Sequence, residues 1–210
     1  FEGNPSFQTL DTKEKVQSFF ETTFGDVCSL MPTLQEDFFN NPTSSLVTVK
    51  CFPWSNGNTM LIGDAAHAII PFYGQGMNCG FEDCTVLNEL MEQFNDDWSK
   101  IIPAYQTARK PNSDGIADLA KLNFIEMRDL VADPDFQFKK KIAAKVSEVY
   151  PDRFIPVYSM VSFSHLPYSE ALKEYKRQDE VLSAALNLPD IREKWDNIYF
   201  EQIANQLFNQ

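Results

Sequence analysis

Apolar residues recur at intervals of three and four along most of the chain, which is the spacing of helices that bury one face. A first helix is predicted over residues 12–24, where Val16, Phe19, Phe20 and Phe24 share one face. Further helices with the same periodicity are predicted over residues 80–93, 98–109, 113–132, 134–149 and 168–186. The pattern therefore predicts a chain that is mostly helical after residue 80.

Prolines divide this helical part into segments. Pro103, Pro111 and Pro134 lie near predicted helix starts, where a proline removes no intrahelical hydrogen bond. After Pro189 the chain ends in a tail with a helical pattern of apolar residues, namely Ile198, Phe200, Ile203 and Leu207. Core packing or a loose tail is favoured over membrane contact for this amphipathic segment.

A different pattern precedes the helices. Residues 46–52 alternate apolar and polar positions, as a half-buried strand does, and residues 55–58 (Ser-Asn-Gly-Asn) are typical of a turn. A hairpin with residues 59–62 as its second strand is therefore predicted. That strand stops at Gly63 and Asp64, which would place a carboxylate at the carboxyl end of a strand.

The segment that follows combines the groups that a flavin needs. Asp64 can accept hydrogen bonds from ribityl hydroxyls, and Gly74, Gly76 and Gly80 let the backbone approach a flat ring closely. A helix that starts at these glycines offers free N–H groups, which favour the negative charge of a reduced pyrimidine edge. The structural alternatives are a turn or helix cap at Asp64 and a plain tight turn at the glycines.

These residues carry a resemblance to a known family. Residues 63–67 (Gly-Asp-Ala-Ala-His) and 71–80 (Pro-Phe-Tyr-Gly-Gln-Gly-Met-Asn-Cys-Gly) resemble the second flavin motif of the single-component FAD-dependent aromatic hydroxylases. Residues 71–84, 123–128 (Asn-Phe-Ile-Glu-Met-Arg) and 154–161 (Phe-Ile-Pro-Val-Tyr-Ser-Met-Val) are similar to the branch that hydroxylates L-kynurenine. The resemblance runs from about residue 1 to about residue 180.

The resemblance implies a monooxygenase that converts L-kynurenine to 3-hydroxy-L-kynurenine with FAD, NADPH and dioxygen. NADPH would reduce the flavin, oxygen would form a C4a-hydroperoxide on it, and the distal oxygen would attack the ring carbon beside the aniline nitrogen. The cofactor supplies oxidising power, whereas the protein supplies position, dryness and electrostatics. Attachment to the cytosolic face of the mitochondrial outer membrane is also implied.

The matching positions give the candidate site residues. For the cofactor they are Asp64, Gly74, Gln75, Gly76, Met77 and Asn78. For the substrate the resemblance supplies Phe72, Tyr73, Asn123, Met127 and Tyr158. Because Asn123 and Met127 are four residues apart on a predicted helix, both are expected to face one cavity.

Other polar side chains have structural interpretations. His67 stands between alanines just after the predicted strand and is expected to be structural or a supporting donor rather than an acid or base. Glu126 and Arg128 are expected to form an ion pair or to support the pocket. Four cysteines and two histidines show no zinc spacing, so no metal site is expected, and no catalytic side chain is assigned.

A dinucleotide-binding fingerprint, Gly-x-Gly-x-x-Gly after a strand, is missing from the chain. By the resemblance, the ADP-binding half lies upstream of Phe1, and this chain is a carboxyl-terminal half that is inactive alone. The expected fold class is α+β or α/β, in which strands, the FAD-motif loop and a helix complete an upstream Rossmann-like domain and a mostly helical part follows. The expected regions are 1–57 (end of the substrate-binding sheet), 58–110 (FAD-binding domain), 111–186 (helical substrate-pocket domain) and 187–210 (tail).

The charge and composition of the chain limit the classes of partner that it is expected to bind. The 210 residues carry a formal net charge of −12, which argues against nucleic acid. One basic run, Lys139–Lys141 with Lys145, is expected to be a solvated helix face, with an anionic membrane surface as the alternative. Eighteen phenylalanines suit large packed surfaces, some of them against the amino-terminal half of the same enzyme.

Two other functions stay open. One is another FAD-dependent hydroxylase with a phenolic substrate, against which the Phe72-Tyr73 loop and the segments at Asn123 and Tyr158 argue. The other is a non-catalytic fragment that serves as an interaction or membrane-docking module. The missing dinucleotide fingerprint keeps the second possibility open for the chain alone.

Overall fold

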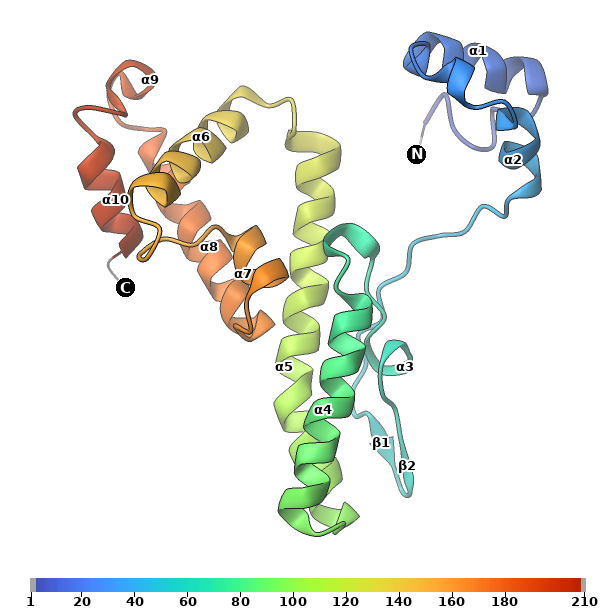
Figure 1. Cartoon of the computed structure of the whole chain (residues 1–210), viewed down its shortest axis with the longest axis vertical. Coiled ribbons are helices and arrows are strands. Elements are labelled where there is room, and N and C mark those ends of the chain that lie inside the picture. Colours follow the sequence, from blue (N-terminus) through green and yellow to red (C-terminus); the bar gives the residue numbers. More distant parts are fainter. Residues whose placement is uncertain (1–2, 209–210) are drawn as a thin grey trace. The chain divides into compact units, whose positions relative to one another are not determined.

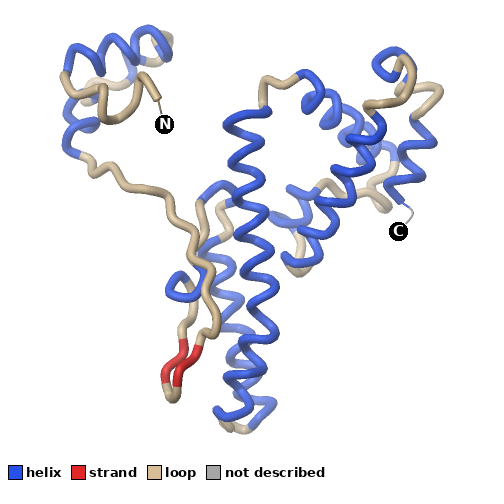
Figure 2. Tube along the Cα trace, turned by 180° about the vertical axis from the view of Figure 1, so that it is seen from behind, coloured by secondary structure: helices blue, strands red, loops and turns tan. Residues whose placement is uncertain are grey.

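The computed structural model describes residues 3–208. Phe1, upstream of which the ADP-binding half is expected, and the last two residues of the predicted tail lie outside the described residues. The chain divides into two compact units, one up to Leu46 and one from Val47 onward. Helices dominate both units, and strands occur only in one short hairpin within the described part (Figure 2). The predicted mostly helical character is confirmed.

The first unit is built from α1 (Lys13–Phe24), a 3-10 turn at Cys28–Leu30 and α2 (Leu34–Asn40). The first of these confirms the predicted helix: the Thr12 hydroxyl accepts a hydrogen bond from the backbone N–H of Lys15 and caps it. Val16 is fully buried. The rings of Phe20 and Phe38 meet edge to face with centroids 6.4 Å apart, so the phenylalanine-rich face of α1 packs on α2.

The second unit opens with a hairpin of β1 (Ser55–Asn56) and β2 (Thr59–Met60), in which Ser55 pairs with Met60. The predicted turn is therefore correct, whereas the predicted strand over residues 46–52 is wrong. That segment forms no ladder with another strand of the described residues, although the Val49 N–H donates to the Ala68 carbonyl at 2.8 Å. Alternation describes which faces a strand would bury, but a strand also needs a neighbour to accept its hydrogen bonds.

Short helices α3 (Asp64–His67) and the 3-10 turn at Pro71–Tyr73 lead into α4 (Gly76–Phe94), which starts four residues before the predicted Gly80. The next helix, α5 (Trp98–Ile125), runs unbroken through the predicted gap at residues 110–112 and through the predicted region boundary there. Both Pro103 and Pro111 lie inside it, so the prediction of two helices is wrong.

The proline at position 111 should cost a helix interior on the order of 3 kcal/mol. Packing compensates for this cost, because α5 buries one side on α4 and another on α8 (Figure 1). Tertiary burial thus overrides the local breaker.

The remaining elements are a π-helical turn at Glu126–Leu130, α6 (Pro134–Val149), α7 (Val157–Phe163), α8 (Tyr168–Ala185), α9 (Ile191–Lys194) and α10 (Phe200–Phe208). The predicted helices over 134–149 and 168–186 are confirmed. Asp133 caps α6 by accepting from the Phe136 N–H at 2.7 Å, and Pro134 stands at its first position.

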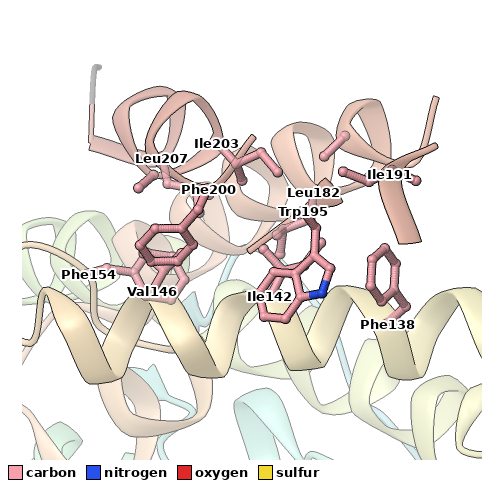
Figure 3. Packing of buried hydrophobic residues seen from close by; sticks show 12 residues of the cluster. Phe138, Ile142, Val146, Phe154, Leu182, Ile191, Trp195, Phe200, Ile203 and Leu207 are labelled. Atoms are coloured by element: carbon pink, nitrogen blue, oxygen red, sulfur yellow. The ribbon is translucent and has the colours of Figure 1, made fainter. Parts of the chain in front are cut away.

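The last helices close over α6 to form a core that we call the apolar cluster (Figure 3). It consists of Phe138, Ile142, Val146, Phe154, Leu182, Ala185, Ile191, Trp195, Phe200, Ile203, Ala204 and Leu207. The amphipathic pattern of the tail is therefore satisfied by core packing, except at Ile198, which is 62% exposed.

In the basic run on α6, Lys140, Lys141 and Lys145 are exposed as predicted, and Lys139 is the exception. Lys139 is only 18% exposed and donates to Asp179 at 2.5 Å, and Lys140 donates to Glu126 at 3.0 Å. The ammonium of Lys141 lies 5.1 Å from the centre of the Trp195 ring. Within the described residues, no helix combines the length and apolarity needed to cross a membrane.

Candidate functional site

The glycine-rich motif runs from the start of α3, through a loop, to the start of α4. Gly63 adopts a left-handed φ of 61°, and Asp64 follows it as the first residue of α3. Because β2 ends at Met60, Asp64 does not stand directly at the end of a strand as predicted. Its side chain is exposed and is free to meet a ligand at this corner.

The second half of the motif builds the start of α4. Gly74 takes a left-handed φ of 67°, Gln75 is the N-cap residue, and Gly76, Met77 and Asn78 form the first turn. The first N–H groups of a helix have no carbonyl one turn earlier to accept their hydrogen bonds. No side chain caps this helix start, so these backbone donors stay open.

The side chain of Gln75 ties the motif to a distant helix. Gln75 is only 7% exposed, and its Oε1 accepts hydrogen bonds from Asn78 Nδ2 at 2.9 Å and from Tyr168 Oη at 3.1 Å. Tyr168 is the first residue of α8. The loop before α4 is therefore held from two sides.

Beneath the loop lies a set of buried charged groups that we call the ionic cluster: His67, Asp83 and Arg109. The Asp83 carboxylate is fully buried and lies 2.5 Å from His67 Nε2, while it accepts from Arg109 Nε at 2.6 Å. It also accepts from the Gly63 N–H at 2.9 Å, so the ionic cluster fixes the start of the motif. His67 is thus structural, in line with the sequence interpretation.

Burial is the largest single influence on His67 and would lower its pKa, but hydrogen bonds and charge interactions with Asp83 and Cys79 together outweigh burial and raise that pKa to about 10. Burial pushes the pKa of Asp83 upward, whereas His67 and Arg109 pull it below its ordinary value. His67 is therefore a cation at neutral pH, and the carboxylate stays ionised between two cations.

The same region contains three groups whose ligand atoms lie within 4.8 Å of one another, on His67, Cys79 and Asp83. A metal ion there would have to displace the guanidinium of Arg109, which bonds Asp83 and also donates to the Cys79 carbonyl at 3.0 Å and to its sulfur at 3.4 Å. The cationic position is already filled by protein, so we assign no metal site.

The substrate candidates gather around a cavity of about 320 Å³ between α5, α6, α7 and α8. Tyr73, Asn123 and Tyr158 all line it, and the rings of Tyr73 and Tyr158 stack with centroids 5.7 Å apart. Asn123 donates to the Phe72 carbonyl at 2.6 Å, which ties α5 to the loop at Pro71–Tyr73. The ring of Phe72 packs on Phe124 at 4.7 Å.

Two of the substrate candidates, Phe72 and Met127, do not line this cavity. Met127 is 58% exposed. The α-helix gives way to a π-helical turn at Glu126, and the wider turn rotates residue 127 away from the face of Asn123. The four-residue spacing therefore does not put the two side chains together.

Glu126 and Arg128 do not form the ion pair offered as one of their two roles. Glu126 lines the cavity, where it accepts from Tyr175 at 3.1 Å and from Lys140 at 3.0 Å. Arg128 bonds Asp129 at 2.7 Å. Pocket support is thus the role that fits Glu126.

Sequence reasoning missed Asp83 and Arg109 as organisers of the motif. Each stands on the apolar stripe of its helix, Asp83 four residues after the buried Cys79 and Arg109 four residues after the buried Tyr105. A charged residue in register with buried positions signals a buried ion pair, and this signal was available in the sequence.

The sequence of this chain is similar to those of known proteins. The family model of an FAD binding domain matches residues 31–120. A kynurenine 3-monooxygenase of Christiangramia forsetii is 49% identical over 96% of this chain and 45% of its own length. The kynurenine 3-monooxygenase of Flavobacterium johnsoniae is 51% identical over 93% of this chain and 44% of its own length. That of Dictyostelium discoideum is 43% identical over 100% of this chain and 49% of its own length. The chain spans about half the length of the curated relatives it matches.

Proposed function

Because this chain belongs to the kynurenine 3-monooxygenase family of flavin-dependent monooxygenases, we propose that it supplies half of an FAD site and part of the pocket for L-kynurenine. The rest of the FAD site would come from the amino-terminal half of the same enzyme. The proposal rests above all on two features of the motif, the uncapped start of α4 and the exposed carboxylate of Asp64.

The residues present fit a flavin. Asp64 is an acceptor for polyol hydroxyls, and the open N–H groups of Gly76, Met77 and Asn78 are donors for an electron-rich ring edge. A Cβ added at Gly74 or Gly80 would meet no other atom within 4 Å, so the backbone there has open space before it. Donors, acceptor and space together match a ring with a polyol chain.

Bound FAD, reduced by NADPH, would supply the activated oxygen that hydroxylates the kynurenine ring beside its aniline nitrogen. The helix dipole and the open N–H groups of α4 would stabilise negative charge on the reduced ring edge. Tyr73 and Tyr158 would press on a flat substrate and exclude water, and Asn123 would hold the loop that carries Tyr73. A cation from the amino-terminal half would meet the substrate carboxylate.

Exposed apolar side chains support a partner for the second unit. Val47, Phe52, Met77 and Phe81 are each 60–70% exposed, on the segment that leads into the hairpin and on α4. Such a surface suits contact with the remaining half of the enzyme. Attachment to the mitochondrial outer membrane stays an untested hypothesis, since two of the relatives compared are bacterial.

The FAD site is tested by Asp64→Ala in the full-length enzyme. Loss of the polyol contact should weaken FAD binding by about 1.5–3 kcal/mol, which is the range for hydrogen bonds to charged groups. Flavin absorbance of the purified protein and titration of the apoprotein measure the effect. Asp152→Ala, at another exposed carboxylate, is the control and should retain FAD. Normal FAD affinity in Asp64→Ala would overturn the assignment, and a colourless wild type would favour a non-catalytic module.

The substrate pocket is tested by Tyr158→Phe and Asn123→Ala. A loosely held substrate leaves the oxidised intermediate open to water, so we expect a higher KM for L-kynurenine or more hydrogen peroxide per NADPH consumed. Tyr150→Phe removes a hydroxyl that bonds Glu201 in the last helices and serves as control. Unchanged KM and coupling in both pocket variants would show that these residues are only core. Faster turnover of a phenol than of L-kynurenine by the wild type would favour the phenolic hydroxylase.

A further inference from the structure

The hydroxyl of Tyr168 reaches the flavin motif from a helix that begins more than ninety residues later. Tyr168 is 5% exposed, and burial raises the pKa of its hydroxyl, so the group stays protonated and donates to Gln75 Oε1. That oxygen also accepts from Asn78 within the first turn of α4. One acceptor thus joins α8 to both the cap and the first turn of α4.

The start of α8 is itself fixed against α5. Asn112 Oδ1 accepts from the backbone N–H of Ser169 at 3.2 Å and from its hydroxyl at 3.0 Å. At Gly115 the two backbones approach so closely that an added Cβ would lie 2.9 Å from the backbone of Tyr168 and Ser169. Tyr168 is therefore presented to Gln75 by a rigid junction of two helices.

We propose that Tyr168 is a positioning residue of the flavin half-site, which sets the placement of the first turn of α4 through Gln75. The proposal rests on the proposed function, because the open N–H groups of that turn act on a flavin. Donors held at a fixed place stabilise the reduced, anionic ring edge more than the oxidised one, since they need no reorganisation when the charge appears. Without the Tyr168 hydroxyl, Gln75 gains freedom and this preference weakens.

The experiment is Tyr168→Phe in the full-length enzyme, with the midpoint reduction potential of the bound flavin as the main readout. We expect a more negative potential than in the wild type, and an FAD dissociation constant raised by about threefold to tenfold, as for one lost hydrogen bond. Tyr150→Phe is the matched control. It removes one tyrosine hydroxyl that bonds Glu201 next to the apolar cluster, so it should leave the potential unchanged.

A second variant approaches the same bond from the other end. Gln75→Met removes the acceptor and should shift the potential in the same direction, and Tyr168→Phe added to Gln75→Met should then have no further effect. Additive shifts in the double variant, or a potential in Tyr168→Phe equal to that of the control, would overturn the proposal. If the wild type binds no FAD, the proposed function itself fails, so the two failures are distinguishable.

Discussion

The ionic cluster beneath the flavin motif and the apolar cluster of the last helices are both buried, yet they hold the chain by different means. In the ionic cluster one carboxylate, Asp83, gathers the motif loop, α3 and α5 through directed bonds of 2.5–2.9 Å. In the apolar cluster α6, α8, α9 and α10 meet through hydrocarbon and aromatic rings (Figure 3). The first fixes a geometry, whereas the second supplies burial.

The two interiors should therefore fail differently. Loss of apolar volume is graded, because neighbours relax into part of the space. Loss of one buried charge leaves its partners uncompensated in a medium that solvates them poorly. A single substitution in the ionic cluster should therefore disturb more of the surrounding structure than a single substitution in the apolar cluster.

The sharpest test of this contrast is Asp83→Ala in the full-length enzyme. It leaves His67 and Arg109 buried without their shared carboxylate, which should lower the free energy of unfolding by about 3–5 kcal/mol. Because Gly63 also loses its acceptor, FAD binding should weaken at the same time. Urea unfolding and FAD titration measure the two effects. A loss of stability below about 1 kcal/mol would show that Asp83 does not organise the motif.

The counterpart in the apolar cluster is Ile203→Ala. Ile203 is fully buried, so truncation should lower the free energy of unfolding by roughly 3 kcal/mol through lost burial and the cavity left behind. The flavin motif lies in another core, and the FAD dissociation constant of the folded variant should match that of the wild type. A weakened FAD affinity in the folded state would show that the two interiors are coupled. Ile203→Val, with a smaller deletion, should lose only about 1 kcal/mol.

Alkaline pH should weaken the ionic cluster alone. The pKa of His67 is raised from 6.5 to about 10 in the folded state. Its contribution is therefore complete below pH 6.5 and is lost as pH rises toward 10. Urea midpoints of the wild type should fall across this window, whereas His67→Gln should start lower and lose less. Parallel curves for the two proteins would contradict the assignment of a charged His67.

The sequence allowed prediction of elements whose signals are local. The helix start near residue 12, the helix start at Pro134 and the apolar stripes of α4 and α8 each depend on residues within one or two turns. The strand over residues 46–52 and the break at Pro111 failed because a distant partner decides them: a strand needs a neighbour, and α5 stays whole by packing. Among site residues, the cavity brings together Tyr73, Asn123 and Tyr158, while the π-helical turn that displaces Met127 leaves no sequence signal that we can identify.

Because α5 is one unbroken helix, it limits which insertions, deletions and substitutions the chain can accept. Arg109 serves the ionic cluster and Asn123 serves the cavity, about four helical turns further along the same helix. Insertion or deletion of one residue between them would rotate one site by about 100° relative to the other. Substitutions along this stretch can vary in side chain, but its length is fixed by two sites at once. Related sequences should therefore differ here in the identity of their side chains but have the same number of residues between the two sites.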